Sequence, residues 1–122
     1  MKILAVDDEI VKLESLKRGL KIMGYDVVEA LGADEALRVL NTKKNGVGLV
    51  LIDYTMPGMN GLDLLKNIRK FHACLPVVIM TAYLEDGLVG EALQNNCNTL
   101  IEKPFSLDQL IQTIEGVLDN HH

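Results

Sequence analysis

The sequence predicts an α/β protein: a doubly wound (βα)₅ domain with a five-stranded parallel sheet and helices on both faces. Short apolar runs rich in Val, Ile and Leu alternate along the chain with segments in which apolar residues recur every three or four positions. Runs without polar alternation are typical of strands buried on both faces of a parallel sheet, and spacings of three and four indicate helices. The length of 122 residues fits a single domain of this kind.

Five apolar runs supply the strands. In chain order they are Lys2–Val6, Asp26–Ala30, Val47–Ile52, Pro76–Met80 and Thr99–Ile101. A helical segment follows each run. Because right-handed crossovers join parallel strands, we expect the helices to cover both faces of the sheet.

Three helices are expected in the first part of the chain. The first has its apolar residues at Ile10, Leu13, Leu16 and Leu20 and stops at Gly24. The second covers Ala33–Leu40 and breaks in the polar stretch that follows it. The third, Leu62–Arg69, ends before Pro76.

The last two helices differ in predicted strength. Leu84–Asn95 contains Gly87 and Gly90, each of which costs about 1 kcal/mol relative to Ala in a helix interior. These glycines indicate either a segment suited to local opening or close packing against a neighbour. The fifth helix, Ser106–Leu118, opens with a capping box between Ser106 and Gln109. Its expected inner face consists of Leu107, Leu110, Ile111 and Ile114.

Composition and charge narrow the function classes. A formal net charge of −5 argues against a surface that binds nucleic acid. No apolar run approaches the roughly 18–20 residues of a membrane span, and the apolar start is too short for a signal peptide. Cys74 and Cys97 lack CxxC spacing and a His cluster, so we expect free thiols and a cytoplasmic protein. Residues 1–120 form the expected domain, and we interpret His121-His122 as the remnant of a purification tag.

Four of the five apolar runs end at polar residues of a distinctive kind. These residues are Asp7-Asp8-Glu9 after the first run, Asp53 after the third, Thr81-Ala82 after the fourth and Glu102-Lys103-Pro104 after the fifth. The carboxyl ends of parallel strands share one edge, and ligands of open α/β sheets bind beyond it. We therefore expect three carboxylates, a hydroxyl and an ammonium group to converge there.

Each of these residues also has a purely structural interpretation. Asp8 or Glu9 could be the N-cap of the next helix, and Asp53 could open a turn. Thr81 could cap the fourth helix, and Lys103 could be a solvated surface lysine. Their joint occurrence at successive strand ends favours a shared function over independent structural roles.

Three carboxylates at one point need a compensating charge. Two of them about 4 Å apart repel by roughly 4 kcal/mol at an effective dielectric constant near 20, so a cation must bind or one acid must stay protonated. Oxygen ligands without His or Cys favour Mg²⁺, or Mn²⁺ as a substitute, over zinc. Such a metal and the Lys103 ammonium would neutralise phosphoryl oxygens while a carboxylate attacks phosphorus. The set therefore suits phosphoryl transfer.

At these residues the sequence resembles the receiver domains of two-component response regulators. The resemblance covers Lys2 to Leu118. Its motifs are Asp7-Asp8, the stretch Leu51-Ile52-Asp53-Tyr54-Thr55-Met56-Pro57-Gly58-Met59-Asn60-Gly61, the pair Thr81-Ala82, and Lys103-Pro104-Phe105. The resemblance implies a flavodoxin-like fold with strand order 2-1-3-4-5, and a signalling switch rather than an enzyme.

The resemblance also implies an acceptor and a metal site. Asp53 would accept a phosphoryl group from a phosphohistidine of a sensor histidine kinase or a phosphotransfer protein. Mg²⁺ would be held directly by Asp8, Asp53 and the backbone carbonyl of Thr55. Asp7 would act on the metal mainly through a bound water.

Three further residues would bind the phosphoryl group. Lys103 would pair with Asp53 before phosphorylation and with a phosphoryl oxygen afterwards. The Thr81 hydroxyl and the Ala82 backbone amide would take the remaining oxygens. The resemblance further implies a cis peptide bond at Lys103-Pro104.

The output face is expected around the weakened fourth helix, which directly follows Thr81-Ala82. Phosphorylation would shift or order Leu84–Asn95 and remodel the surface that it forms with Thr99–Glu102 and Ser106–Leu118, where an effector domain or a second copy would bind. Receivers often carry Tyr or Phe three residues before the lysine, and Leu100 stands there in this chain, which puts coupling through an aromatic side chain in doubt. Tyr83 and Thr55 occupy positions at which the family tunes the phosphoryl lifetime. The cognate kinase, effector, pathway and oligomeric state stay open.

Other functions fit the residues less well. An Asp-nucleophile phosphatase of the haloacid-dehalogenase type needs a D-x-D motif and usually a cap domain, whereas this chain has adjacent Asp7-Asp8 and no length for a cap. A flavodoxin-like nucleotide binder needs a Gly-, Ser- or Thr-rich phosphate loop, and Asp7-Asp8-Glu9 would repel phosphate there. A receiver-like domain without phosphoryl chemistry is disfavoured because no acidic or basic member of the set is missing.

Overall fold

The computed structural model describes residues 1–120 and contains one five-stranded sheet. The strands are β1 (Lys2–Asp7), β2 (Asp26–Leu31), β3 (Val47–Asp53), β4 (Val77–Thr81) and β5 (Thr99–Glu102). Neighbouring strands are all parallel, in the order β2-β1-β3-β4-β5. The predicted fold class and strand order are both confirmed.

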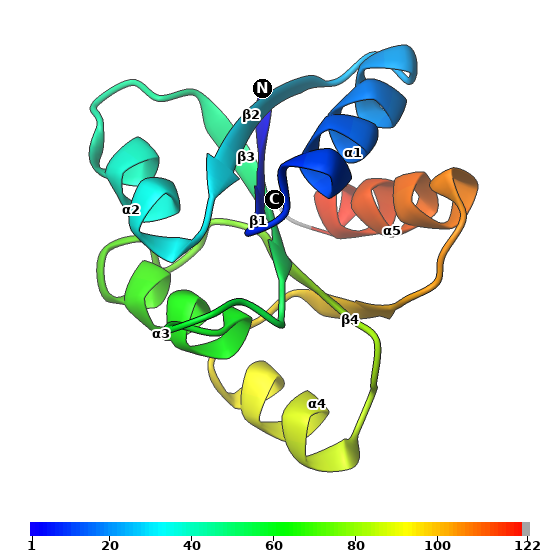
Figure 1. The fold of residues 1–122 in the computed structure, drawn as a ribbon. Helices are drawn as coiled ribbons and strands as arrows, with labels where there is room; N and C mark the ends of the chain where they lie inside the picture. The colour runs from blue at the N-terminus through cyan, green and yellow to red at the C-terminus, as the bar shows by residue number, and fades with distance from the viewer. Residues whose placement is uncertain (121–122) are drawn as a thin grey trace.

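Five helices connect and follow the strands. They are α1 (Ile10–Ile22), α2 (Ala33–Asn41), α3 (Gly61–Phe71), α4 (Asp86–Gln94) and α5 (Leu107–Asp119). Figure 1 shows α1 and α5 on one side of the sheet and α2 and α3 on the other, with α4 beyond β4. This is the two-sided arrangement that right-handed crossovers produce.

Side chains of the central strands alternate between two cores. Leu4, Val50 and Ile79 point toward the cluster that also contains buried residues of α2 and α3. Ile3 and Leu51 point toward the cluster that contains buried residues of α1 and α5. Both sets are fully buried, which explains why the strands are continuous apolar runs in the sequence.

The strands extend one residue further than predicted, into the polar positions. Asp7 pairs with Leu31, Asp53 pairs with Met80, and Thr81 pairs with Glu102 in the strand register. These three polar residues, Asp7, Asp53 and Thr81, are 3–4% exposed. They therefore belong to the hydrogen-bonded sheet, which is a more rigid support than a loop.

Two residues expected in the core are exposed. Ile10 is 55% exposed at the start of α1, and Leu107 is 36% exposed at the start of α5. Each stands in the first turn of its helix, where the helix has not yet reached the sheet. Leu107 nevertheless packs against Gly19 of α1. A Cβ added to Gly19 would lie only 3.1 Å from the Leu107 Cδ1 atom.

The fourth helix begins later than predicted, at Asp86 rather than Leu84. A Cβ added at Gly87 or Gly90 would have no heavy atom within 4 Å. The interpretation of these glycines as close-packing residues is therefore wrong, and they leave α4 locally weak. In α5, by contrast, Ser106 and Gln109 form both hydrogen bonds of the predicted capping box.

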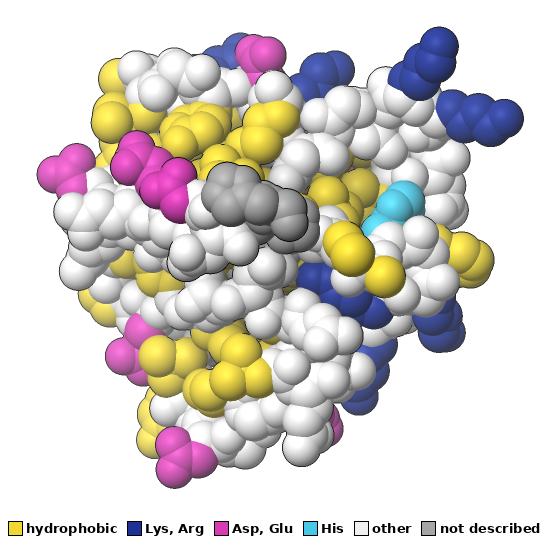
Figure 2. Space-filling model, turned by 180° about the vertical axis from the view of Figure 1, so that it is seen from behind, with side chains coloured by type: hydrophobic (Ala, Val, Ile, Leu, Met, Phe, Trp, Pro, Cys, Tyr) yellow, Lys and Arg dark blue, Asp and Glu magenta, His cyan; other side chains and the backbone are white. Residues whose placement is uncertain are grey.

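Surface features agree with the composition. Cys74 and Cys97 are free thiols, as predicted. On the face drawn in Figure 2, hydrophobic side chains gather in separate patches rather than one continuous field. No helix within residues 1–120 is long and apolar enough to cross a membrane. The interpretation of His121-His122 as a tag remnant concerns residues outside this range.

Candidate functional site

Three acidic residues meet at the carboxyl edge of the sheet, as the strand ends predicted. Asp7 ends β1, Asp53 ends β3, and these strands are neighbours in the sheet. With Asp8, each offers a carboxylate oxygen, and these oxygens lie within 4.8 Å of one another. Asp7 and Asp53 are buried, whereas Asp8 is exposed.

Burial raises the pKa of the Asp7 carboxyl above its ordinary value of 3.8. The Glu9 backbone amide, which donates a 3.0 Å hydrogen bond to Asp7 Oδ1, opposes this effect, and the neighbouring Asp53 charge adds to it. Both effects disfavour the ionised form of Asp7, burial more strongly than the Asp53 charge. A cation at this point would stabilise the ionised form.

Lys103 supplies one positive charge. Its ammonium nitrogen lies 2.8 Å from Asp53 Oδ1, and the lysine and aspartate side chains are 27% and 6% exposed. Its backbone N–H donates to the Thr81 carbonyl at 2.7 Å, which ties the start of this segment to the end of β4. The Lys103-Pro104 peptide is cis, as predicted. Lys103 is thus an ion-pair partner of the acid cluster and not a solvated surface lysine.

Thr81 is the last residue of β4 and Ala82 follows it, at the edge of the sheet where the acids lie. The buried Thr81 hydroxyl accepts a 3.2 Å hydrogen bond from the Tyr83 N–H, so it turns the chain out of the strand. A cleft of about 480 Å³ opens there, with Thr55 and Ala82 among its lining residues. The walls of this cleft come from the loops after β3 and β4 and from residues of α3 and α4, and they include Tyr54, which follows Asp53 in the chain.

The loop after β3 is fixed by its glycines. The Gly61 N–H donates to the Tyr54 carbonyl at 2.8 Å, and a Cβ at Gly61 would lie 2.8 Å from the Tyr54 Cα. Gly58 has φ = 79°, a conformation that favours glycine. Asn60 then caps α3 by accepting from the Asp63 N–H at 2.9 Å. These constraints hold the Asp53–Gly61 segment close against the sheet.

The competing structural interpretations fare differently. Glu9 does occupy the N-cap position of α1, but its side chain makes no capping hydrogen bond. Glu85, not Thr81, is the N-cap of α4. The acids at the sheet edge are therefore not explained by helix capping.

Sequence reasoning assigned no role to Glu102, which ends β5. Its carboxylate accepts a 3.1 Å hydrogen bond from the Leu84 N–H, which joins the β4–α4 loop to the edge strand. Its place at a strand end, next to Lys103, was the one available signal. Nothing in the sequence indicated its partner, because the two residues are 18 positions apart.

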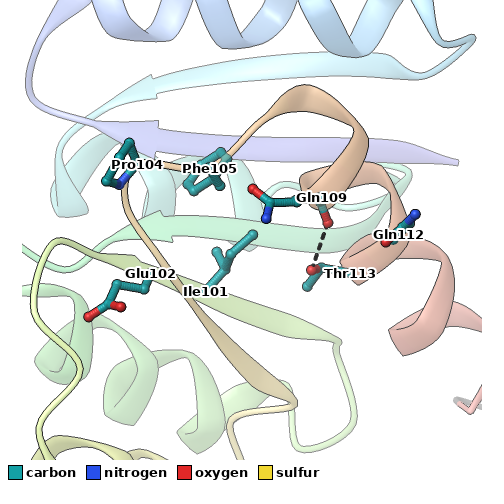
Figure 3. A pocket seen from close by; sticks show the side chains of 7 residues that line it. All are labelled: Ile101, Glu102, Pro104, Phe105, Gln109, Gln112 and Thr113. Atoms are coloured by element: carbon teal, nitrogen blue, oxygen red, sulfur yellow. Dashed lines mark hydrogen bonds between the residues drawn. The ribbon is translucent and has the colours of Figure 1, made fainter.

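A second hollow lies on the β5–α5 side, away from the acids. It has a volume of about 570 Å³ and is lined by Ile101, Glu102, Pro104, Phe105, Gln109, Gln112 and Thr113. Figure 3 shows these side chains on β5, on α5 and on the connection between them, with the Thr113 hydroxyl bonded to the Gln109 carbonyl. This hollow belongs to the surface predicted to carry output.

The acid cluster fits a divalent cation that prefers oxygen ligands. Asp7, Asp8 and Asp53 each provide a carboxylate oxygen within a 4.8 Å span, and no His or Cys side chain belongs to the group. This donor set suits Mg²⁺ or Mn²⁺ better than zinc.

Comparisons with known proteins agree with this site. A family model described as the response regulator receiver domain matches residues 3–115. The chain is 36% identical over 122 residues to the chemotaxis protein CheY-3 of Vibrio cholerae, covering 98% of this chain and 92% of that protein. It is 38% identical over 117 residues to the transcriptional regulatory protein CpxR homolog of Haemophilus influenzae, covering 96% of this chain.

The chain spans about half the length of some of these relatives: 50% of the CpxR homolog and 58% of the probable transcriptional regulator ycf29 of Cyanophora paradoxa. Among solved structures, a response regulator receiver domain protein from Clostridium thermocellum superimposes with a TM-score of 0.90 at 29% identity, covering 97% of this chain and 94% of that chain. The chemotaxis protein CheY4 of Vibrio cholerae gives 0.87 at 26% identity, covering 95% and 97%.

Receiver domains are signalling switches whose general role is to accept a phosphoryl group, and they generally bind Mg²⁺ at an acidic pocket. They work with histidine kinases and effector domains. The fold, the strand-end acids and the family match agree over nearly the whole described chain. This chain therefore belongs to the response regulator receiver domains of two-component signal transduction.

Proposed function

We propose that this domain accepts a phosphoryl group on Asp53 from the phosphohistidine of a sensor histidine kinase or phosphotransfer protein, in a Mg²⁺-dependent reaction. The observation that carries the proposal is the 2.8 Å contact between the buried Asp53 carboxylate and Lys103, beside the Asp7 and Asp8 carboxylates. A buried nucleophile with its own cation and an adjacent acid pair is the arrangement that carboxylate attack on phosphorus requires.

The proposed step can be written with this chain's own residues. A carboxylate oxygen of Asp53 forms a bond to phosphorus while the P–N bond to the donor histidine breaks, and the bonding pair leaves with the imidazole. Lys103 exchanges its contact with Asp53 for one with a phosphoryl oxygen. The Thr81 hydroxyl and the Ala82 amide, at the wall of the neighbouring cleft, donate to the others.

Asp8 and Asp53 would hold Mg²⁺ directly, together with the backbone carbonyl of Thr55, and Asp7 would act through a water. When bound, the ion would neutralise charge on the phosphoryl oxygens as they approach the acids. Mn²⁺ would substitute, because it accepts the same oxygen ligands. Because Asp8 is exposed, a metal ion bound to it would be able to exchange its water ligands with solvent.

Signal output would pass through the loop after β4. To donate to a phosphoryl oxygen, the Thr81 hydroxyl must give up its 3.4 Å hydrogen bond to the Tyr83 carbonyl, and this change would move the loop that Glu102 ties to β5. The Glu102–Leu84 contact offers a coupling route that does not need an aromatic side chain at Leu100. An effector domain or a second copy would bind the surface of α4, β5 and α5, which includes the hollow of Figure 3.

Phosphorylation with acetyl phosphate and Mg²⁺, followed by mass spectrometry of the acyl phosphate, tests the proposal. We expect one phosphoryl group per chain on Asp53, none in Asp53→Asn, and nearly none in Asp8→Ala, because the second variant loses a direct metal ligand. Lys103→Ala should bind Mg²⁺ but be phosphorylated slowly. Stoichiometric labelling that persists in Asp53→Asn would refute the assignment.

A further inference from the structure

We propose that Lys12 is a positioning residue that guides the negatively charged phosphoryl donor to Asp53 across a hollow beside α1. The inference rests on the proposed function. It names a residue that is not among the site residues Asp7, Asp8, Asp53, Thr81 and Lys103. Lys12 has no distinctive context in the sequence, since it is one of several lysines in the first helix.

The hollow provides the geometry. It has a volume of about 260 Å³ and is lined by Asp7, Lys12, Ser15, Leu16, Met80, Lys103 and Phe105. It is lined by Asp7 of the acid cluster and by Lys103, the ion-pair partner of Asp53, so it borders the site. Its two lysines come from different elements, Lys12 from α1 and Lys103 from the segment after β5. A donor that crosses this hollow passes between two ammonium groups.

The charge balance gives Lys12 a task. Asp7, Asp8 and Asp53 form the cluster, and Glu9 adds a fourth acid next to it. Lys103 is already engaged with Asp53 at 2.8 Å. An approaching phosphoryl dianion therefore meets an excess of negative charge even when a divalent cation is bound, and a second cation at the entrance lowers that repulsion.

Lys12 is free to do this. Its ammonium nitrogen lies 3.2 Å from Glu9 Oε2, and both side chains are 55% exposed. Exposed pairs of this kind contribute little and exchange partners readily. The Lys12 pKa is raised first by Glu9 and further by Asp7 and Asp53, so the ammonium group lies within the field of the acid cluster. Lys12 can release Glu9 and pair with a phosphoryl oxygen.

The reaction that Lys12 assists can be written with a small phosphoryl donor. With acetyl phosphate, an Asp53 oxygen bonds to phosphorus as the bridging P–O bond breaks, and the electron pair leaves with acetate. Lys12 changes no bond in this step. It raises the frequency of productive encounters, so its effect should depend on donor charge and on salt.

The experiment compares second-order rate constants for acyl phosphate formation, at Mg²⁺ concentrations that saturate each variant. Lys12→Gln should lower the rate constant with acetyl phosphate about threefold and Lys12→Glu about tenfold, whereas Lys12→Arg should retain it. The loss should be smaller with phosphoramidate, which carries less negative charge near neutral pH. Added salt should slow the parent more than Lys12→Gln.

Lys17→Gln is the matched control, because Lys17 lies on the same helix but pairs with Glu29 at 3.0 Å. It should react as the parent does. If Asp53 is phosphorylated normally in Lys12→Gln and Lys12→Glu, with unchanged salt dependence, Lys12 has no guiding role and the proposed function still stands. If the parent itself is not phosphorylated on Asp53, the proposed function fails instead.

Discussion

Helices α3 and α4 follow neighbouring strands of the sheet, yet they are built very differently. The α3 helix buries five residues: Gly61, Leu62, Leu64, Leu65 and Ile68. The α4 helix buries only Ala92. The Asn60 side chain caps α3, whereas the residue at the start of α4, Glu85, makes no side-chain capping bond. Figure 1 shows α3 against the sheet and α4 at the outer end of the molecule.

This difference bears on how a receiver can be both a precise site and a switch. The loop that precedes α3 begins at Asp53 and must keep its carboxylate at a fixed place. The loop that precedes α4 follows Thr81 and, in the proposed switch, would move when the phosphoryl group binds. Strong burial on one side and weak burial on the other allow both, because segments with few buried contacts open at low free-energy cost.

The largest expected contrast concerns one leucine from each helix, buried in α3 and exposed in α4. Leu65→Ala in α3 should lower the free energy of unfolding by about 2–5 kcal/mol, because the leucine is fully buried and its removal leaves a cavity. Leu93→Ala in α4 should change it by less than about 0.5 kcal/mol, because Leu93 is 52% exposed. Urea denaturation of both variants measures the contrast, and equal losses would show that α4 is as firmly packed as α3.

The Arg69 side chain joins α3 to the turn after α4. Arg69, near the end of α3, donates to the Asn96 carbonyl at 2.7 and 3.2 Å and to the His72 carbonyl at 2.8 Å. Arg69→Ala should cost about 1–2 kcal/mol, because these charge-assisted bonds are lost. Arg69→Lys keeps the charge but not the planar donor geometry, so it should restore only part of the stability.

Urea denaturation measures how far Arg69→Ala lowers the free energy of unfolding. Amide exchange shows which segment of the chain is destabilised. Faster exchange in Arg69→Ala should be concentrated at the α4–β5 turn that contains Asn96. Uniform acceleration across the sheet would mean that Arg69 supports the whole core and not the junction between the two sides.

The glycines of α4 provide a gain-of-stability test. Gly87→Ala and Gly90→Ala should each stabilise the protein by about 0.5–1 kcal/mol, since an added methyl group meets open space and restricts the unfolded chain. Slower amide exchange across α4 should accompany the gain. Gly61→Ala is the opposing control: its Cβ would collide with the Tyr54 backbone, so it should destabilise. A loss of stability in the α4 variants would restore the packing interpretation.

Much of the fold could be predicted because its signals are local. Continuous apolar runs identified all five strands, and the capping box at Ser106 located α5. Helix starts were harder: Leu84 has the spacing of a helical residue, but it lies in the loop, where Glu102 binds its backbone N–H. That contact comes from a distant strand, and no local pattern encodes it.

The candidate site followed from topology more than from spacing. Once the strands were parallel, Asp7, Asp53 and Lys103 had to reach the same edge, and the structure brings them together. The hydrogen bond between Glu102 and the Leu84 backbone could not be predicted, and neither could the role proposed for Lys12. Each depends on the direction in which an exposed side chain points. Sequence patterns report burial well and report the direction of exposed side chains poorly.

Near neutral pH the smallest expected effect concerns Cys97, which anchors the turn between α4 and β5. Its thiol is buried and donates to the Thr99 carbonyl at 3.1 Å and to the Val77 carbonyl at 3.5 Å. Burial raises the pKa of this thiol from 9.0 to about 11. Below pH 9 the thiol is neutral in both folded and unfolded chains, so its ionisation has no effect on stability there.

Above pH 9 the effect has a definite sign. The unfolded chain loses the Cys97 proton first, so the folded state loses stability as the pH rises from about 9 to about 11. The free energy of unfolding of the parent should therefore fall more steeply across this range than that of Cys97→Ala, whatever their difference at pH 7. Cys74→Ala is the control, because that thiol is exposed and its removal should leave the slope unchanged. Parallel pH profiles for the parent and Cys97→Ala would show that water reaches the Cys97 thiol. The α4–β5 turn would then be as weakly packed as α4.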